Sequence, residues 1–134
     1  MTAAAAPPAQ TFNVSHPDEA DFKSGGLRAY SAYRDLGVAA ATGGLATAQV
    51  IRMTAPFSER FSQRHHHRGV QFQLVYVLKG WFKTDFEGQG PQLMTAGACW
   101  TQPPGIRHTV LGWSEDCELL EVILPAEHTT VNDD

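Results

Sequence analysis

Short runs of apolar and polar residues follow one another along most of the chain, and none has the spacing of an amphipathic helix. Gly and Pro residues separate most of the runs with strand character, which cover 46–54, 72–78, 81–86, 92–95, 98–101, 108–111 and 117–124. Many short strands with Gly and Pro between them are typical of an all-β sandwich or barrel. The pattern therefore predicts an all-β fold.

The run 72–78 is apolar on both faces of the expected strand. Successive side chains of a strand point to opposite sides of the sheet, so one face carries Val75 and Val77. The other face carries Phe72, Leu74, Tyr76 and Leu78. A strand that is apolar on both faces needs two covering layers. We expect one face to line a barrel and the other to meet a second sheet or a partner subunit.

The length of 134 residues fits one domain. We expect a flexible Ala/Pro-rich tail at 1–12, a single domain at 13–126 with its core at 45–124, and a polar tail at 127–134. No apolar run approaches the ~20 residues that a membrane helix needs. The first residues also lack the pattern of a signal peptide.

The charge and the cysteines narrow the partners and the compartment. A net charge of -4 and a pI of about 5.8 argue against nucleic acid and anionic membranes as partners. Cys99 and Cys117 are isolated and lie in or beside apolar runs, which favours two buried thiols in a reducing cytoplasm. A cytoplasmic location is therefore predicted.

Two segments carry candidate chemistry. Residues 97–108 read GACWTQPPGIRH, and this spacing of Gly, Pro, Gly and His resembles the second motif of the cupin superfamily. Residues 73–80 read QLVYVLKG and are similar to the end of the first cupin motif, with Gln73 at the position of the family's Glu. The His-x-His pair of that motif falls on His65 and His67, or on His66 and Arg68 if the spacing is one residue shorter.

The resemblance, to small single-domain bacterial cupins, implies an RmlC-like jelly-roll barrel of two antiparallel sheets. It also implies a divalent transition metal, namely Fe, Mn, Ni or Zn. The ligands would be His65, His67 and His108, with Gln73 as a possible fourth, and His66 replaces one of them in the shorter spacing. Residues i and i+2 of a strand face the same side, so such a pair can grip one ion. The chain departs from the family at Gly112, where the pattern often has Asn.

The predicted function is metal-dependent chemistry on a small molecule at the barrel mouth. Because Gln73 is neutral, the charge of the ion would be uncompensated and would favour an anionic ligand. Dioxygenation, decarboxylation and isomerisation all occur among cupins, and catalytic residues beyond the metal ligands are not identified. The alternative is a non-catalytic small-molecule binding or sensing module, with or without metal. Family members also imply a homodimer formed through the N-terminal segment 27–38.

Two further histidines and the two glutamates of the last strand are not assigned to the candidate site. His16 and His128 lie in polar terminal regions and are interpreted as surface residues. Glu118 and Glu121 lie three residues apart on the last apolar strand, so they cannot both face one side of it. We expect one of them to face solvent and the other to pair with an arginine.

Overall fold

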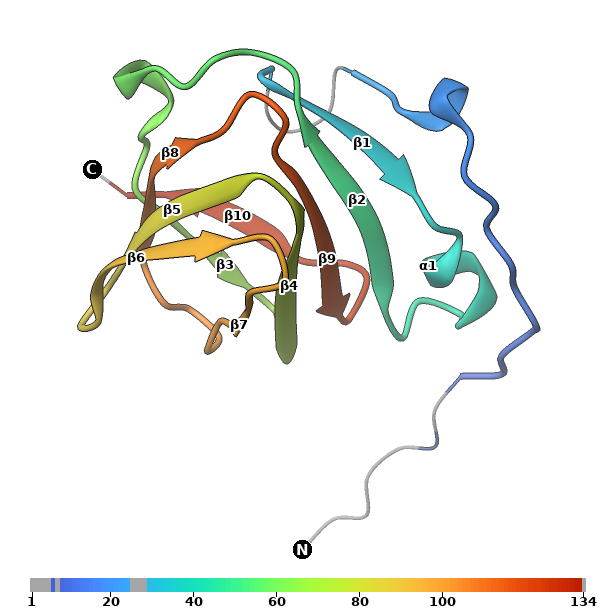
Figure 1. Cartoon of the computed structure of the whole chain (residues 1–134). Helices are drawn as coiled ribbons and strands as arrows, with labels where there is room; N and C mark the ends of the chain where they lie inside the picture. The colour runs from blue at the N-terminus through green and yellow to red at the C-terminus, as the bar shows by residue number, and fades with distance from the viewer. Residues whose placement is uncertain (1–5, 7, 25–28, 134) are drawn as a thin grey trace, which may run out of the picture.

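Two antiparallel five-stranded sheets face each other and enclose the interior of a barrel (Figure 1). The computed structural model describes residue 6, residues 8–24 and residues 29–133. The first sheet contains, in order, β1 (Ser31–Asp35), β2 (Thr47–Met53), β9 (Glu118–Leu124), β4 (Phe72–Lys79) and β7 (Cys99–Thr101). The second contains β10 (Thr129–Asn132), β3 (His65–Arg68), β8 (His108–Trp113), β5 (Trp81–Phe86) and β6 (Gly90–Thr95). The all-β prediction is confirmed.

Helical structure in the described residues is short. It consists of α1 (Val38–Ala41) and two 3-10 turns at Glu19–Asp21 and Glu59–Phe61. None of these helices has the length and apolar character to cross a membrane. The expected N-terminal tail lies in part on residues 1–5 and 7, outside the described residues, as do residues 27 and 28 of the segment proposed for dimer contacts.

The C-terminal residues differ from expectation. The segment 127–134 was expected to be a polar tail, yet Thr129–Asn132 form β10 and pair with β3 from Arg68 to His65. The β-branched residues Thr129, Thr130 and Val131 suit an edge strand, and β3 has a free edge there because its other side pairs with β8. The polar sequence concealed this strand because it lacks the apolar alternation on which strand prediction depends.

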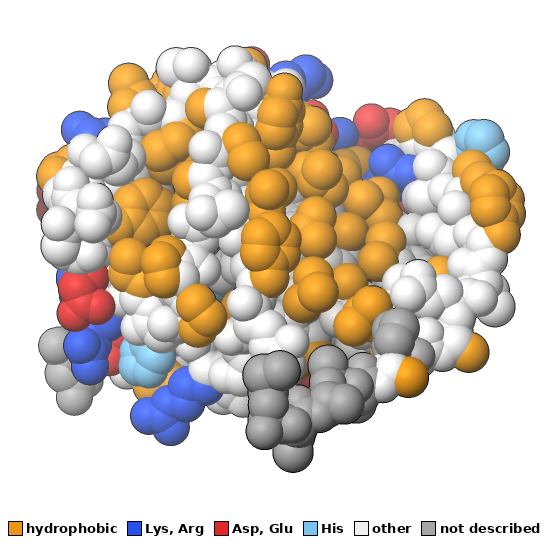
Figure 2. Space-filling view, turned by 90° about the horizontal axis from the view of Figure 1, so that it is seen from below, with side chains coloured by type: hydrophobic (Ala, Val, Ile, Leu, Met, Phe, Trp, Pro, Cys, Tyr) orange, Lys and Arg blue, Asp and Glu red, His pale blue; other side chains and the backbone are white. Residues whose placement is uncertain are grey.

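Strand β4 follows the predicted alternation. Val75 and Val77 face the interior and are 3% and 0% exposed, whereas Phe72, Tyr76 and Leu78 on the outer face are 40%, 39% and 43% exposed. The second sheet of the barrel therefore covers the inner face of β4, and the outer face carries an uncovered apolar row. Figure 2 shows hydrophobic side chains gathered over the middle of one face of the molecule.

Part of the barrel interior is filled by aromatic rings around Trp113. Its ring lies 4.9 Å from that of Tyr30 in a stacked pair and 5.0 Å from that of Phe57 in an edge contact. The indole Nε1 donates a hydrogen bond of 2.9 Å to the carbonyl of Ala55. These contacts bury a large apolar area and satisfy the one polar group of the indole. A cavity of about 330 Å³ remains between the sheets beside this packing.

The motif glycine between β4 and β5 is required by geometry. Gly80 has a φ of +69°, and a Cβ at this position would collide with the hydroxyl of Ser114. Only Gly adopts such a backbone without strain. The motif therefore has Gly at position 80 because a tight turn joins the two sheets there.

The two cysteines differ, and the prediction of two buried thiols is wrong for one of them. Cys99 is exposed because it lies on β7, the edge strand of the first sheet, whereas Cys117 is fully buried. Burial raises the pKa of the Cys117 thiol to about 12, so this thiol stays protonated. Neither cysteine forms a disulfide, and the cytoplasmic location stays a prediction.

Candidate metal centre and the cavity beside it

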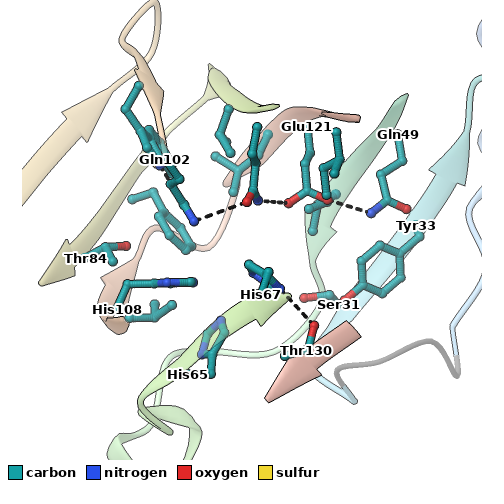
Figure 3. A pocket seen from close by; sticks show the side chains of 18 of the residues that line it. Ser31, Tyr33, Gln49, His65, His67, Thr84, Gln102, His108, Glu121 and Thr130 are labelled. Carbon is teal, nitrogen blue, oxygen red and sulfur yellow. Dashed lines mark hydrogen bonds between the residues drawn. The ribbon is translucent and has the colours of Figure 1, made fainter. Parts of the chain in front are cut away.

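Three imidazoles meet on one wall of the cavity (Figure 3). His65 and His67 are separated by one residue on β3, so both face inward, and His108 begins β8 directly opposite His65 in the strand register. One nitrogen from each ring lies within 4.8 Å of the others. The structure therefore brings together His65 and His67, from the longer spacing of the first motif, and His108, from the second motif.

The backbone fixes the tautomer of two of these rings. His65 Nδ1 lies 2.9 Å from the carbonyl of Gln63, and His108 Nδ1 lies 3.2 Å from the carbonyl of Ile106. A carbonyl oxygen only accepts, so each Nδ1 carries the hydrogen and the neutral ring has its lone pair at Nε2. Orientation of a ligand imidazole by a bond to its other nitrogen is typical of metal sites. The donor set therefore fits a transition-metal ion.

The third ring is held by the strand that the sequence did not predict. His67 Nδ1 lies 2.9 Å from the hydroxyl of Thr130 on β10. A Thr hydroxyl accepts from Nδ1–H as a carbonyl does, so His67 has the same tautomer available as the other two rings. Strand β10 thus contributes directly to the candidate metal centre.

His66 points the other way. Alternation along β3 turns its ring away from the cavity, and its Nδ1 lies 2.9 Å from a carboxylate oxygen of Asp133. The hydrogen bond from His66, with help from Arg107, lowers the pKa of Asp133. The shorter motif spacing, with His66 as a ligand, is therefore not the arrangement that the structure shows. The additional residue lies in the connection between β3 and β4, where Gly69 has a φ of +81°.

Gln73 faces the interior but is engaged by other side chains. Its Nε2 donates to Glu121 over 3.1 Å, and its Oε1 accepts from Gln102 Nε2 over 3.3 Å. Both ends of the amide therefore have protein partners, and a role of Gln73 as a fourth ligand stays a prediction. Gln73, which occupies the position of the family's Glu, donates directly to the carboxylate of Glu121.

These contacts belong to a directed chain of hydrogen bonds along the first sheet. Trp100 Nε1 donates to Gln102 over 2.9 Å, Gln102 donates to Gln73, and Gln73 donates to Glu121. Gln49 donates to the other carboxylate oxygen of Glu121 over 2.9 Å. An indole can only donate, so the direction of every amide from Trp100 onward is fixed. Figure 3 shows that this amide–carboxylate chain lies across the cavity from the histidines.

Glu121 is a candidate functional residue that the sequence analysis did not assign to a site. Burial raises the pKa of its carboxyl group, while the hydrogen bonds from Gln49 and Gln73 oppose this shift. Glu121 shares one face of β9 with the buried residues Leu119 and Ile123, but both faces of this strand are apolar in the sequence, so alternation gave no signal. The expectation that one of the two Glu residues faces solvent is wrong, because Glu121 lines the cavity and Glu118 pairs with Arg52.

The other Glu of that strand behaves as expected. A carboxylate oxygen of Glu118 lies 3.6 Å from a guanidinium nitrogen of Arg52, and the other lies 3.5 Å from Lys79 Nζ. The expected pairing of one Glu with an arginine is therefore present at Glu118.

His128 is a second residue whose place differs from expectation. It was interpreted as a surface residue, but it lines the cavity, and its ring centroid lies 5.8 Å from that of His67. Its Nδ1 is buried and has no hydrogen-bond partner among the described residues. His16, in contrast, is exposed as predicted.

The cavity wall combines polar and apolar side chains. Among the described residues that line it, none is Lys or Arg, and Glu121 is the one carboxylate. Its apolar part is formed by Ile51, Met53, Val75, Phe82, Trp100, Val110, Leu119 and Ile123. Mostly apolar cavities with a few convergent polar groups are typical of small-molecule sites.

This architecture is similar to that of several proteins of known structure. No family model matches the sequence, and no curated protein sequence matches it. Solved structures, in contrast, match the fold of this chain. KdgF from Halomonas sp. has 14% identity and a TM-score of 0.64, over 87% of this chain and 96% of that one. The polyketide cyclase RemF from Streptomyces resistomycificus has 19% identity and a TM-score of 0.67, over 90% of this chain and 86% of that one.

A third similar structure is a sugar phosphate isomerase of the cupin superfamily from Silicibacter pomeroyi, with 19% identity and a TM-score of 0.66, over 87% of this chain and 80% of that one. Identities this low establish the fold and leave the activity open. The paired sheets, the motif glycine at the β4–β5 turn and these likenesses together show that the chain has the cupin fold.

Proposed function

We propose that this chain binds one divalent transition metal through His65, His67 and His108 and acts on a small molecule held in the cavity beside the ion. The observation that carries the proposal is the group of three imidazole nitrogens within 4.8 Å, with each ring tied at Nδ1 to an oxygen. Fe, Mn, Ni and Zn all accept such nitrogen ligands. A bound ion would supply Lewis acidity to a substrate oxygen.

The charge balance of the site differs from that inferred from Gln73 alone. Three neutral imidazoles leave the charge of an ion uncompensated, but Glu121 provides a carboxyl group in the same cavity. No Lys or Arg lines this cavity in the described part of the chain. The preference for an anionic ligand, which was inferred from the neutral Gln73, is therefore not part of this proposal.

Among the reaction classes expected, we favour those that move a proton on a substrate, such as isomerisation. A carboxyl group with a raised pKa across the cavity from an electrophilic ion suits proton transfer. The similar structures include proteins named as an isomerase and as a cyclase, and these names describe those proteins. Dioxygenation and decarboxylation stay predictions from the resemblance.

Metal content of protein purified without a histidine tag tests the proposal. We expect about one transition-metal ion per chain in the unaltered protein and in His66→Ala, whose imidazole faces away from the cavity. His108→Ala should lose the metal while it keeps its fold. Metal content in His108→Ala equal to that of the unaltered protein would contradict the proposal. Metal-free protein that still binds a small molecule would favour the non-catalytic module.

We also propose that the chain forms a homodimer through the outer face of β4. The apolar row of Phe72, Tyr76 and Leu78 supports this, because exposed apolar patches mark interfaces. Leu78→Lys should shift the mass measured by light scattering toward the monomer. Leu93→Lys, at an exposed Leu of β6, is the matched control and should leave the mass unchanged.

A further inference from the structure

One buried hydroxyl of the cavity wall has no hydrogen-bond partner among the described residues. Thr84, on β5, is 1% exposed, and its Oγ1 forms no hydrogen bond with any described residue. Figure 3 shows the side chain at the edge of the cavity beside His108, with the oxygen turned toward the interior. Buried polar groups without a partner destabilise a fold and are rare in native proteins. The hydroxyl is therefore available to a molecule that enters the cavity.

The opposite wall offers acceptor capacity as well. Each carboxylate oxygen of Glu121 receives one amide N–H, from Gln49 and from Gln73. A carboxylate has about four lone-pair sites, so the oxygens retain capacity for further donors. Because the amide direction is fixed from Trp100, the Gln73 amide cannot turn its oxygen toward Glu121. The carboxylate therefore remains an acceptor for a ligand in the cavity.

The remainder of the lining excludes some ligands and favours others. No cationic side chain lines the cavity in the described residues, so an anionic group near Glu121 would meet like charge without compensation. Phe82 and Trp100 present stacked rings, with centroids 6.0 Å apart and planes inclined by 11°. Such rings suit a flat or apolar ligand face.

We propose that the cavity binds a neutral hydroxylated molecule with an apolar face, and that Thr84 and Glu121 bind its hydroxyl groups. This inference deepens the proposed function by naming the ligand class, but it depends on the cavity wall and is independent of metal binding. It predicts selection by hydroxyl donors and against negative charge, even when no ion is present.

Three ring compounds of similar size test the inference on metal-free protein by NMR titration. Resorcinol carries two hydroxyl groups that are too far apart to chelate an ion, 1,3-dimethoxybenzene lacks the donors, and benzoate carries a negative charge. Sites that hydrogen-bond a hydroxyl discriminate strongly against analogues without it. We expect resorcinol to bind at least about tenfold more tightly than either of the other two. Equal or tighter binding of benzoate would overturn the inference.

Two variants test whether Thr84 causes the preference for resorcinol. Thr84→Val removes a hydroxyl that has no protein partner, so the fold should be retained with an equal or higher melting temperature, while the preference for resorcinol over 1,3-dimethoxybenzene falls by about tenfold. Thr95→Val, on the exposed side of β6, is the matched control and should bind as the unaltered protein does. An unchanged preference in Thr84→Val would overturn the role of this hydroxyl.

Glu121→Gln tests the selection against charge, and it should reduce discrimination against benzoate. If this variant does not fold, the Thr84→Val result still decides the inference. Resorcinol selection in a protein that never binds metal would support this inference and contradict the proposed metal function. Metal binding without resorcinol selection would do the reverse, so the two failures are distinguishable.

Discussion

The two walls of the cavity are built in different ways. The histidine wall comes from β3 and β8, where a two-residue spacing and one cross-strand pair bring three rings together. The opposite wall comes from β2, β4, β9 and the residue after β7, where a chain of amides ends at one half-buried carboxylate. Short motifs encode the first wall, whereas the register of strands that are distant in sequence creates the second.

This difference has a chemical consequence. The histidine wall supplies neutral nitrogen donors, and the amide–carboxylate wall supplies an acid group whose pKa is raised by burial. A cation held on one side and a carboxyl group on the other would polarise a small molecule between them. Substitutions that affect one wall without the other test whether the walls act separately.

The largest effect is expected on metal affinity when one of the proposed metal ligands is removed. His67→Ala removes one of three nitrogen donors, and the affinity for a titrated divalent metal should fall by more than about 100-fold, the upper end of the losses seen for outer-shell residues. Isothermal titration with Zn²⁺ measures this affinity. His66→Ala, on the same strand but facing outward, should bind Zn²⁺ as the unaltered protein does. Equal losses in both variants would contradict the assignment of ligands.

The second effect concerns the amide–carboxylate wall. Gln73→Glu places a second carboxyl group beside Glu121 and removes the N–H that Glu121 accepts. We expect the free energy of unfolding at neutral pH to fall by roughly 2 kcal/mol, because the half-buried carboxylate of Glu121 loses a donor and gains a neighbouring like charge. Urea denaturation of metal-free protein measures it. A variant as stable as the unaltered protein would mean that the chain does not hold Glu121 in place.

A smaller effect is expected at the residue that orients His67. Thr130→Val removes the hydroxyl 2.9 Å from His67 Nδ1 and keeps the shape of the side chain. Loss of such an outer contact typically lowers metal affinity by about 10-fold to 100-fold, and we expect the lower end here because one ring of three is affected. The same Zn²⁺ titration provides the measurement, and an unchanged affinity would show that β10 does not contribute to the site.

The smallest effect is a dependence of stability on pH. Since the pKa of Glu121 is raised in the folded state, the folded protein holds this proton more tightly than the unfolded chain does. Its contribution therefore favours folding at low pH and is lost as the pH rises from the unfolded value near 4.5 through the folded pKa. Gln49, Gln73 and His128 act on this group and partly offset the shift.

Comparison with Glu121→Gln isolates this contribution. The stability of the unaltered protein should decline relative to that of the variant as the pH rises above 4.5. Urea denaturation across a pH series measures the difference. Parallel stability curves for the two proteins would show that Glu121 has the same pKa in the folded and unfolded states.

Sequence reasoning predicted one wall well and the other poorly. The alternation rule places His65 and His67 on one face and the second motif adds His108, but local spacing left His66 open as an alternative ligand. Gln73 was correctly placed on an inward-facing position, but its partners come from β9 and from the residue after β7. Local spacing carries no information on such distant contacts.

The remaining misses have physical reasons. Strand β9 is apolar on both faces in sequence, so alternation alone did not decide which Glu faces inward. Its pairing with β2 places Glu121 directly opposite Gln49, and that register follows from tertiary structure. His128 and Thr130 lie in a polar segment that becomes part of the barrel because β3 has an edge to pair with.

Whether the three histidines hold one ion is decided by a crystal structure of the metal-loaded protein, with anomalous scattering recorded at the absorption edge of the metal. We expect a single strong peak between β3 and β8, about 2.1 Å from the Nε2 atoms of His65, His67 and His108. A peak beside His66 and Asp133, or coordination through Nδ1 of the three rings, would contradict it.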